Sequence, residues 1–194
     1  MTFRNDVSYS NYCRAGVLRW TVLALVLSPS CHVMLLHRIG SCLYRTPFGF
    51  LSRLLWWAGI VLYGADIHPG AIFEKGCYMP HTVGVVVGNG ARFLGNVKLM
   101  QGSTVGGNLS RTIAWGPDRI VIRLPVFESD ACVGAHALVV GPLVFPKVVF
   151  IGHNQLITSG SGRECLLMGD CELALPGELR ESFSPALQPV EKVT

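Results

Sequence analysis

The sequence predicts a mainly β protein, a parallel β-helix built from hexapeptide repeats, preceded by a short α-helical N-terminal region. A helix would space its apolar residues three and four apart, and an ordinary strand would alternate them strictly. Here a bulky apolar residue returns every six residues between Ile67 and Gly107, with Gly and Asn at the turns, which is typical of a parallel β-helix. The repeating positions are Ile67, Phe73 and Met79 and, after a two-residue slip assigned to Val85 and Val86, Val87, Phe93, Leu99 and Val105. Small or β-branched residues follow four places later, at Ala71, Val83, Ala91, Val97 and Ser103.

The period is interrupted once and then returns. Residues 108–124 break it and are expected to form a loop that projects from one corner and walls a site, since long loops on a rigid scaffold often carry function. The second run of repeats has its bulky residues at Phe127, Val133, Val139, Phe145, Ile151 and Ile157. No period follows Ser159, so residues 161–194 are expected to be an irregular tail. The β-helix domain is therefore predicted over residues 66–160.

Residues 1–65 are different in kind and are expected to be helical. Apolar segments at 17–27, 31–44 and 50–63 are separated by Ser28-Pro29-Ser30 and by Pro47. No uninterrupted apolar run reaches the roughly 20 residues that a spanning helix needs, so we expect small helices packed on the end of the β-helix. Peripheral contact with a membrane surface stays open as an alternative, because bulky side chains flanked by Arg can lie in the interface.

Composition limits the function classes. The 194 residues carry a net charge of +4, too mild and too scattered to indicate a nucleic-acid partner. The seven cysteines form no CxxC pair and their number is odd, which, without a convincing secretory signal, favours the reducing cytoplasm. Cys77 and Cys132 are interpreted as fillers of small apolar positions in the repeat.

Three motifs carry a family resemblance. GADIHPGA (64–71), PHTVGVVVG (80–88) and NVKLMQGSTVGG (96–107) occur in this order. They resemble the hexapeptide-repeat acyltransferases, most closely the serine O-acetyltransferases, whose motifs read DIHPGA, DHATGIVVG and TLGG. The resemblance covers about the middle half of the chain. It implies a left-handed coil, a homotrimer and acetyl-CoA as the acetyl donor.

His81 is the candidate catalytic residue. It matches the His of the family's DHATG motif, which acts there as the general base. A hydroxyl must lose its proton as it attacks a thioester, and an imidazole, with an ordinary pKa of about 6.5, can take that proton and return it to the leaving thiolate. Backbone N–H groups would meet the oxyanion.

Two departures from the family pattern bear on the acceptor. Pro80 stands where the family has Asp, and Leu124 stands where the family's RHP motif has a second His that helps to bind serine. Asp118 and Asp130 are alternative carboxylate partners for His81. Serine is the acceptor that the resemblance implies, and a sugar or polysaccharide precursor is the alternative. A degenerate, non-catalytic β-helix scaffold is the alternative from another class.

The remaining candidates concern cofactor and metal binding. VGAHALVVG (133–141) resembles the family's IGAGAKILG coil, and the pantetheine arm of coenzyme A lies in that family along a groove between adjacent β-helices. The resemblance assigns this groove to the small residues Gly106, Gly107, Gly134, Ala135 and Gly141, and Lys147 could meet a coenzyme A phosphate. His68 is expected to be structural. His136 and His153 are not expected to share one face, and the spacing of His81, His136 and His153 does not fit a three-histidine zinc site, so no metal is predicted.

Overall fold

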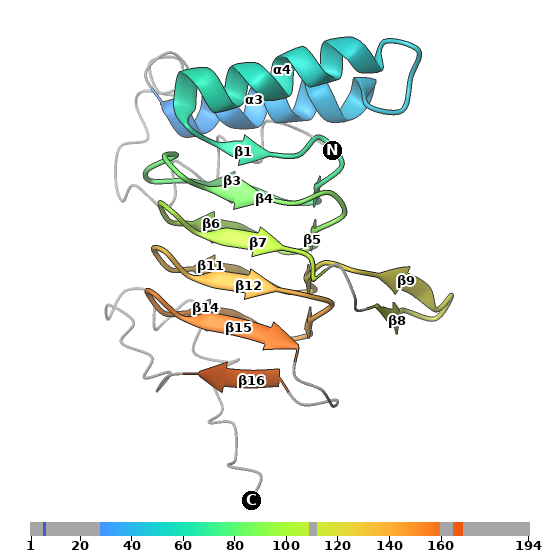
Figure 1. The fold of residues 1–194 in the computed structure, drawn as a ribbon, viewed down its shortest axis with the longest axis vertical. Coiled ribbons are helices and arrows are strands. Elements are labelled where there is room, and N and C mark those ends of the chain that lie inside the picture. Colours follow the sequence, from blue (N-terminus) through green and yellow to red (C-terminus); the bar gives the residue numbers. More distant parts are fainter. Residues whose placement is uncertain (1–5, 7–27, 109–111, 160–164, 169–194) are drawn as a thin grey trace, which may run out of the picture.

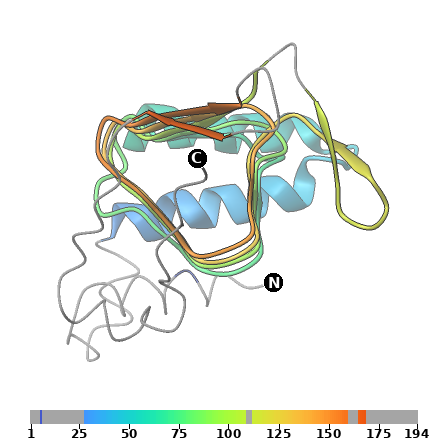
Figure 2. The same ribbon diagram turned by 90° about the horizontal axis from the view of Figure 1, so that it is seen from below.

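The computed structural model is a parallel β-helix with three flat sides, as the six-residue period predicts (Figure 1, Figure 2). It describes residue 6 and residues 28–108, 112–159 and 165–168. Side one contains β1 (Asp66–Ile67), β4 (Val86–Val87), β7 (Thr104–Gly106), β12 (Leu138–Val140) and β15 (Leu156–Ser159). Side two contains β2 (Ile72–Phe73), β5 (Arg92–Phe93), β10 (Val126–Phe127) and β13 (Val144–Phe145). Side three contains β3 (Cys77–Tyr78), β6 (Val97–Leu99), β11 (Ala131–Val133) and β14 (Val149–Ile151).

Two corners of this prism matter for function. We call the corner between sides three and one the histidine corner; it comprises residues 79–85, 100–103, 134–137 and 152–155. The corner between sides one and two is called the hairpin corner and comprises, among the described residues, 68–71, 88–91, 107–108, 112–125 and 141–143. The three-residue strand β7 separates the two corners on its coil, a length of about 10 Å at roughly 3.3 Å per residue.

The repeating bulky residues form one continuous core. Ile67, Phe73, Val87, Phe93, Leu99, Val133, Val139 and Ile151 are all buried. On side two the rings of Phe73, Phe93, Phe127 and Phe145 stack one above the other, with centroid separations of 4.8, 5.0 and 4.7 Å and interplanar angles of 10°, 5° and 8°. These separations match the spacing of neighbouring strands in a sheet, about 4.8 Å. Each coil therefore adds one ring to a single phenylalanine stack.

The slip in the period lies at a different place from the one predicted. The amide of Gly102 donates to the carbonyl of Val83, so the two extra residues lie within residues 80–83 and not at Val85 and Val86. Val83 is 69% exposed, whereas Val85 is fully buried and takes the inward position. Period counting missed this because both Val83 and Val85 are β-branched and either could fill the small inward site.

The two cysteines assigned to the core differ from each other. Cys77 is fully buried, as predicted. Cys132 is only half-buried and pairs in register with Lys98 and Phe150 on the outer face of side three, so its assignment as a core filler is wrong. It precedes Val133, whose inward position places its neighbour on the opposite face of the strand.

The interruption in the repeats projects from one corner, as predicted, and its residues pair as a β-hairpin (Figure 1). β8 (Ile113–Trp115) and β9 (Ile120–Ile122) pair antiparallel and project from the prism (Figure 1). The indole N–H of Trp115 donates to Glu128 Oε1 at 2.7 Å, and the Arg92 guanidinium lies 5.6 Å from the centre of the Trp115 ring. Trp115 therefore ties the base of the hairpin to side two. At the C-terminal end, β16 (Cys165–Met168) pairs antiparallel with β15, so the predicted irregular tail contains at least this strand.

Two helices cover the first coil, α3 (Pro29–Leu43) and α4 (Gly49–Tyr63), where helices were predicted. Pro29 occupies the first helical position, where its missing N–H costs nothing. α4 ends at Gly64, which adopts the left-handed conformation (φ 64°) and donates to the carbonyl of Ile60. The predicted apolar segment 17–27 lies outside the described residues. No helix among the described residues has the length and apolar character needed to span a bilayer.

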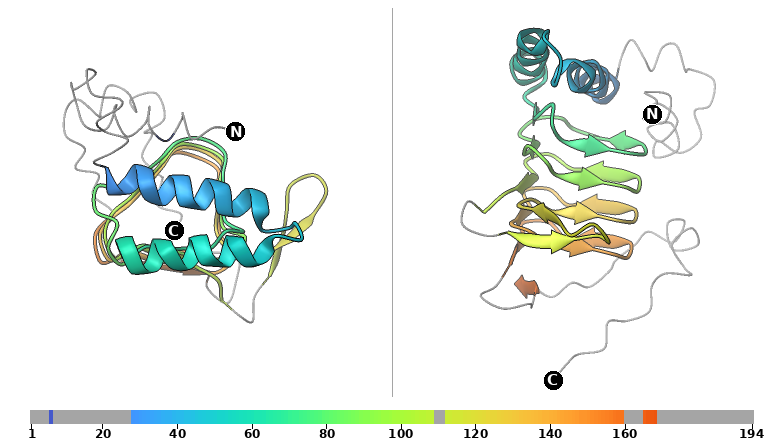
Figure 3. Two further views of the ribbon diagram at one scale, coloured as in Figure 1. Left: turned by 90° about the horizontal axis from the view of Figure 1, so that it is seen from above. Right: turned by 90° about the vertical axis from the view of Figure 1, so that its right-hand side faces the viewer.

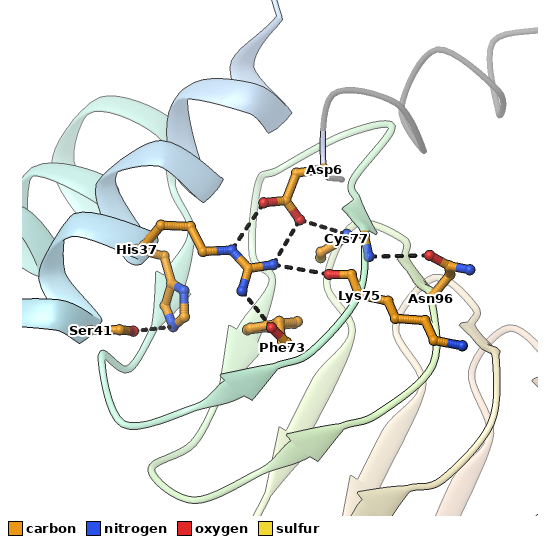
Figure 4. A network of polar contacts seen from close by, with 9 residues as sticks. Asp6, His37, Ser41, Phe73, Lys75, Cys77 and Asn96 are labelled. Atoms are coloured by element: carbon orange, nitrogen blue, oxygen red, sulfur yellow. Dashed lines mark hydrogen bonds and ion pairs between the residues drawn. The ribbon is translucent and has the colours of Figure 1, made fainter. Parts of the chain in front are cut away.

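A buried ion pair fastens α3 to the coils (Figure 4). Arg38 Nε and Nη2 each donate to Asp6 at 3.0 Å, and the same guanidinium donates to the carbonyls of Phe73 and, at 2.9 Å, Lys75. Asp6 also accepts from the amide of Cys77 at 2.9 Å. Burial raises the pKa of Asp6, while Arg38 opposes that rise. A charge this buried requires its partners, so Asp6 links the start of the chain to the first coil.

His37 on α3 makes stability depend on pH. Burial, reinforced by the charge of Arg38, lowers the pKa of His37 to about 4. In the unfolded chain His37 takes up a proton near its ordinary pKa of about 6.5. The contribution of neutral, buried His37 to the free energy of unfolding is therefore fully present above that pH and decreases as the pH falls toward 4. We expect the free energy of unfolding to fall by about 3 kcal/mol over this interval.

Urea denaturation at pH 7 and pH 4 tests this expectation, with His37→Gln as the matched variant. The variant should lack this part of the pH dependence. Asp6, whose shift has the opposite sign, and His68 are present in both proteins, so they cancel in the difference. Equal pH dependence in wild type and variant would show that His37 does not titrate between the two states.

Candidate active site

The segment 80–83 of the histidine corner, which contains the two extra residues, presents His81 to solvent. Its backbone is fixed against the end of α4: Thr82 Oγ1 donates to the carbonyl of Tyr63 at 2.8 Å, and the amide of Gly84 donates to the carbonyl of Gly64 at 2.8 Å. With Thr82 buried and turned inward, the His81 side chain is exposed, and no hydrogen bond joins it to another residue in the described part of the chain. The two extra residues thus push an unengaged imidazole out from a rigid corner.

His136 lies on the same corner, and sequence reasoning gave it no role there. Gly84, Gly102, His136 and Asn154 occupy equivalent places in successive coils, with φ of 74°, 67°, 56° and 56°. A side chain is unfavourable in this left-handed region, and the resembling coil IGAGA has Gly where this chain has His136. A Cβ atom on Gly102 would collide with the His136 ring, so the imidazole lies over the preceding coil, on the side of His81. The mismatch with IGAGA was the available signal.

The other two histidines of the coils, His68 and His153, accept backbone hydrogen bonds. His153 Nδ1 accepts from the amide of Ala135 at 2.9 Å. His68 Nδ1 accepts from the amide of Gly70 at 2.9 Å, and its ring makes edge contacts with Tyr44 and Trp56. Burial lowers the pKa of His68, with Asp66 acting in the opposite direction. Both rings stabilise turns, which supports the structural role predicted for His68.

The two carboxylates proposed as partners of His81 lie elsewhere. Asp130 is at the corner between sides two and three, where its Oδ1 accepts from the amide of Asn96 at 2.8 Å. Asp118 is exposed at the turn of the projecting hairpin, between β8 and β9. Within the described residues neither one is bonded to His81. No group of three or more His, Cys, Asp or Glu side chains in the described part of the chain could hold a metal ion.

The structure divides the five predicted cofactor residues between the two corners. Gly134 and Ala135 lie on the histidine corner with His81, whereas Gly106, Gly107 and Gly141 lie at the other end of side one. A Cβ on Gly134 would lie 2.7 Å from the carbonyl oxygen of Ile151, so close packing of two coils already requires this glycine. Lys147 is exposed at the corner between sides two and three, which contains neither set.

Leu124 lies at the hairpin corner and covers two glycines. Its Cδ2 is 2.7 Å from where a Cβ would stand on Gly88, and its Cδ1 is 3.3 Å from the corresponding position on Gly107. The side chain also packs against the hydrophobic core. The hairpin corner therefore presents an apolar surface beside Gly107, the exposed member of the predicted cofactor set.

Known proteins identify the family. No protein-family model matches the chain. The serine acetyltransferase of Helicobacter pylori is 31% identical over 141 residues, covering 73% of this chain and 77% of that protein. The chain belongs to the serine acetyltransferase family. The Bacillus subtilis serine acetyltransferase is 32% identical over 130 residues, which are 67% of this chain and 54% of that longer protein. The predicted membership of the acetyl-CoA-dependent O-acetyltransferases is confirmed.

Solved serine acetyltransferases share the fold. The Neisseria gonorrhoeae enzyme in complex with serine matches with a TM-score of 0.60 at 22% identity, covering 86% of this chain and 67% of that one. The Brucella abortus enzyme in complex with coenzyme A also gives a TM-score of 0.60, at 21% identity, covering 86% and 66% of the two chains. These neighbours confirm the left-handed coil that the sequence motifs implied.

Proposed function

We propose that this member of the serine acetyltransferase family transfers an acetyl group from acetyl-CoA to a hydroxyl, with His81 as the general base. The observation that carries the proposal is the exposed, unengaged imidazole on a fixed corner, within the motif that resembles the family's catalytic one. A general base must reach the proton that it removes, and a ring already committed to a turn, like those of His68 and His153, could not do so.

The reaction needs one base in a ternary complex of protein, acetyl-CoA and acceptor. His81 takes the acceptor hydroxyl proton as the oxygen attacks the thioester carbonyl, and the C=O π electrons move onto oxygen. Backbone N–H groups stabilise this oxyanion. Its collapse breaks the C–S bond, and the departing coenzyme A thiolate takes the proton back from His81. The ester and the free thiol are the products, and the imidazole is neutral again.

A homotrimer is proposed because one prism separates the groups that a site needs. His81, Gly134 and Ala135 are on one corner, while Gly106, Gly107 and Gly141 are about 10 Å away along side one. Prisms packed side by side would form a groove in which the histidine corner of one copy faces the hairpin corner of the next. The pantetheine arm would lie in that groove against the five small residues, with the projecting hairpin as a wall.

Serine is the first acceptor to test, and a sugar or polysaccharide precursor is the second. Family membership supports serine, and the Neisseria gonorrhoeae relative was solved with serine bound. Leu124 supports the alternative, because it can neither form a hydrogen bond nor carry a proton at the position where the family pattern has a second His.

We also propose a cytoplasmic location and peripheral contact between α3–α4 and a membrane surface.

Release of free thiol from acetyl-CoA tests the proposed function. The purified full chain is supplied with acetyl-CoA alone, with serine, and with a panel of monosaccharides and nucleotide sugars. Acceptor-dependent release is expected with one of these classes. Absence of release with every acceptor would support the non-catalytic scaffold instead.

Replacing Leu124 with His should improve serine as an acceptor. We expect wild-type kcat/KM for serine to lie below roughly 10⁴ M⁻¹s⁻¹, the lower end of typical enzymes. Leu124→His should raise it by about tenfold or more, because a site that can hydrogen-bond the substrate discriminates strongly in its favour. Leu124→Met, similar in volume but without the imidazole, is the matched control and should leave the value unchanged. Efficient serine acetylation by the wild type would show that Leu124 does not exclude serine.

A further inference from the structure

The helical cap carries a patch of exposed apolar side chains on its outer face. α3 and α4 lie side by side across the end of the prism (Figure 3). Phe50 and Trp57 of α4 are 65% and 62% exposed. The set that we call the cap patch consists of Ile39, Phe48, Phe50, Leu54, Trp57 and Val61, all of which are exposed. Large exposed apolar patches on a folded protein mark interaction sites.

The spacing of the patch residues on α4 places them on a single face of the helix. Phe50, Leu54, Trp57 and Val61 are four, three and four residues apart, so they share one face of α4. The opposite face is occupied: Ser52 Oγ donates to the carbonyl of Gly40 on α3 at 2.8 Å, and buried Gly59 lies against the chain at Ala65. α4 therefore turns Ser52 and Gly59 inward, whereas Phe50, Leu54, Trp57 and Val61 lie on the opposite face.

The charges around the patch indicate what covers it. Residues 28–65 contain Arg38, Arg45 and Arg53 and no Asp or Glu. Arg38 is engaged by Asp6, whereas Arg45 and Arg53 are exposed. A second copy docked across a two-fold axis would bring like charges together at this face, which is unfavourable. A surface of anionic lipid headgroups offers the opposite charge beside an apolar layer.

The dimensions of α4 favour lying on a bilayer over crossing it. Its 15 residues span about 22 Å, short of the hydrocarbon thickness of about 30 Å. Helices that lie in the interface combine Trp, Phe and Leu on the buried face with Arg at the rim, which is the pattern here.

We propose that the cap patch binds an anionic lipid surface, with α4 parallel to the bilayer and Arg45 and Arg53 at the headgroups. This inference rests on the peripheral contact proposed above and assigns its lipid class and its residues. In the proposed trimer, prisms packed side by side would present three cap patches to one plane, and multivalency would strengthen a weak single contact.

Flotation of the full-length protein with vesicles tests the proposal. Vesicles of phosphatidylcholine alone are compared with vesicles that also contain phosphatidylglycerol. Wild type should float with the anionic vesicles. Phe50→Ser/Leu54→Ser/Trp57→Ser should lower partition by about a hundredfold, because three exposed apolar side chains lose their buried area. Arg45→Gln/Arg53→Gln should lower it by about tenfold or more and abolish its salt dependence. Val121→Gln, an exposed apolar residue on the hairpin, is the matched control and should float like wild type.

The outcomes separate this proposal from the catalytic one. Acceptor-dependent thiol release without vesicles should be unchanged in the triple variant, so loss of lipid binding with intact turnover supports the cap patch. Failure of the wild type to float, or equal partition into neutral and anionic vesicles, would overturn the assignment. A wild-type oligomer that dissociates in the triple variant, with no lipid binding, would show that the patch joins copies of this chain. Thiol release that fails in the wild type would contradict the proposed function and leave the flotation result standing.

Discussion

Replacing His81 with Ala is expected to lower the rate of acetyl transfer by about 10²–10⁴-fold, the usual contribution of a general base. We expect the variant to lose catalysis and not structure. The His81 side chain is exposed, and within the described residues it makes no hydrogen bond whose loss would disturb the corner. Steady-state thiol release with the best acceptor gives the rate. Acetyl-CoA affinity, measured by calorimetry, should change little, since the proposed groove holds the cofactor through backbone groups and small residues.

His81→Asn is the matched variant for this experiment. It keeps a hydrogen-bonding side chain at the corner but cannot take up the proton, so it should be as inactive as the Ala variant. His136→Ala and His153→Ala should leave turnover nearly intact, and His136 is the sharper comparison because its ring lies on the same corner. A folded His81→Asn protein with wild-type turnover would exclude His81 as the base.

Leu99→Asp should unfold the β-helix. Leu99 is fully buried in the middle of the core, on β6, with coils above and below it. An unpaired carboxylate there must be desolvated or protonated, at a cost of several kcal/mol that is comparable to the whole stability of a domain. Circular dichroism during a thermal ramp should show no cooperative transition.

Lys98→Asp is the matched control on the same strand. Lys98 is the neighbouring residue and points to the outer face of side three, so the same new charge remains in water and should shift stability by only about 0.5 kcal/mol. A folded Leu99→Asp protein with a wild-type transition would contradict the predicted core.

The coil was predictable from sequence because its period is unusual. Phe93, Leu99 and Val105 are six residues apart and all buried, and neither a helix nor an alternating strand produces that spacing. The two extra residues of the histidine corner were placed at Val85 and Val86 instead of within 80–83, because Val83 and Val85 are equally suited to an inward place and only the backbone hydrogen bonds distinguish them. The hairpin was missed because its strands are short and their exposed residues Ile113, Ile120 and Val121 follow no core pattern.

The candidate site was predictable in its residue but not in its surroundings. PHTVG singled out His81 by motif, but a motif says nothing about which corners lie together. Gly107 and Gly134 were grouped because both are small and near matched motifs, yet they lie on different corners. The place of His136 on the histidine corner was not predicted, because it depends on backbone conformation: a left-handed residue stacked on Gly102 is visible only in three dimensions.

The phenylalanine stack shows that this architecture can take up an insertion at one corner without losing its fold. Phe93 and Phe127 are separated by the whole hairpin in sequence, yet their rings are 5.0 Å apart, like those of the neighbouring pairs. The coil thus tolerates a long insertion at a corner, where residues leave the prism and return to the same place. Doubling such an excursion costs only about 0.6 kcal/mol in loop-closure entropy. Within this fold, the hairpin is consequently free to diversify in length and sequence, while the stacked rings keep successive coils in register.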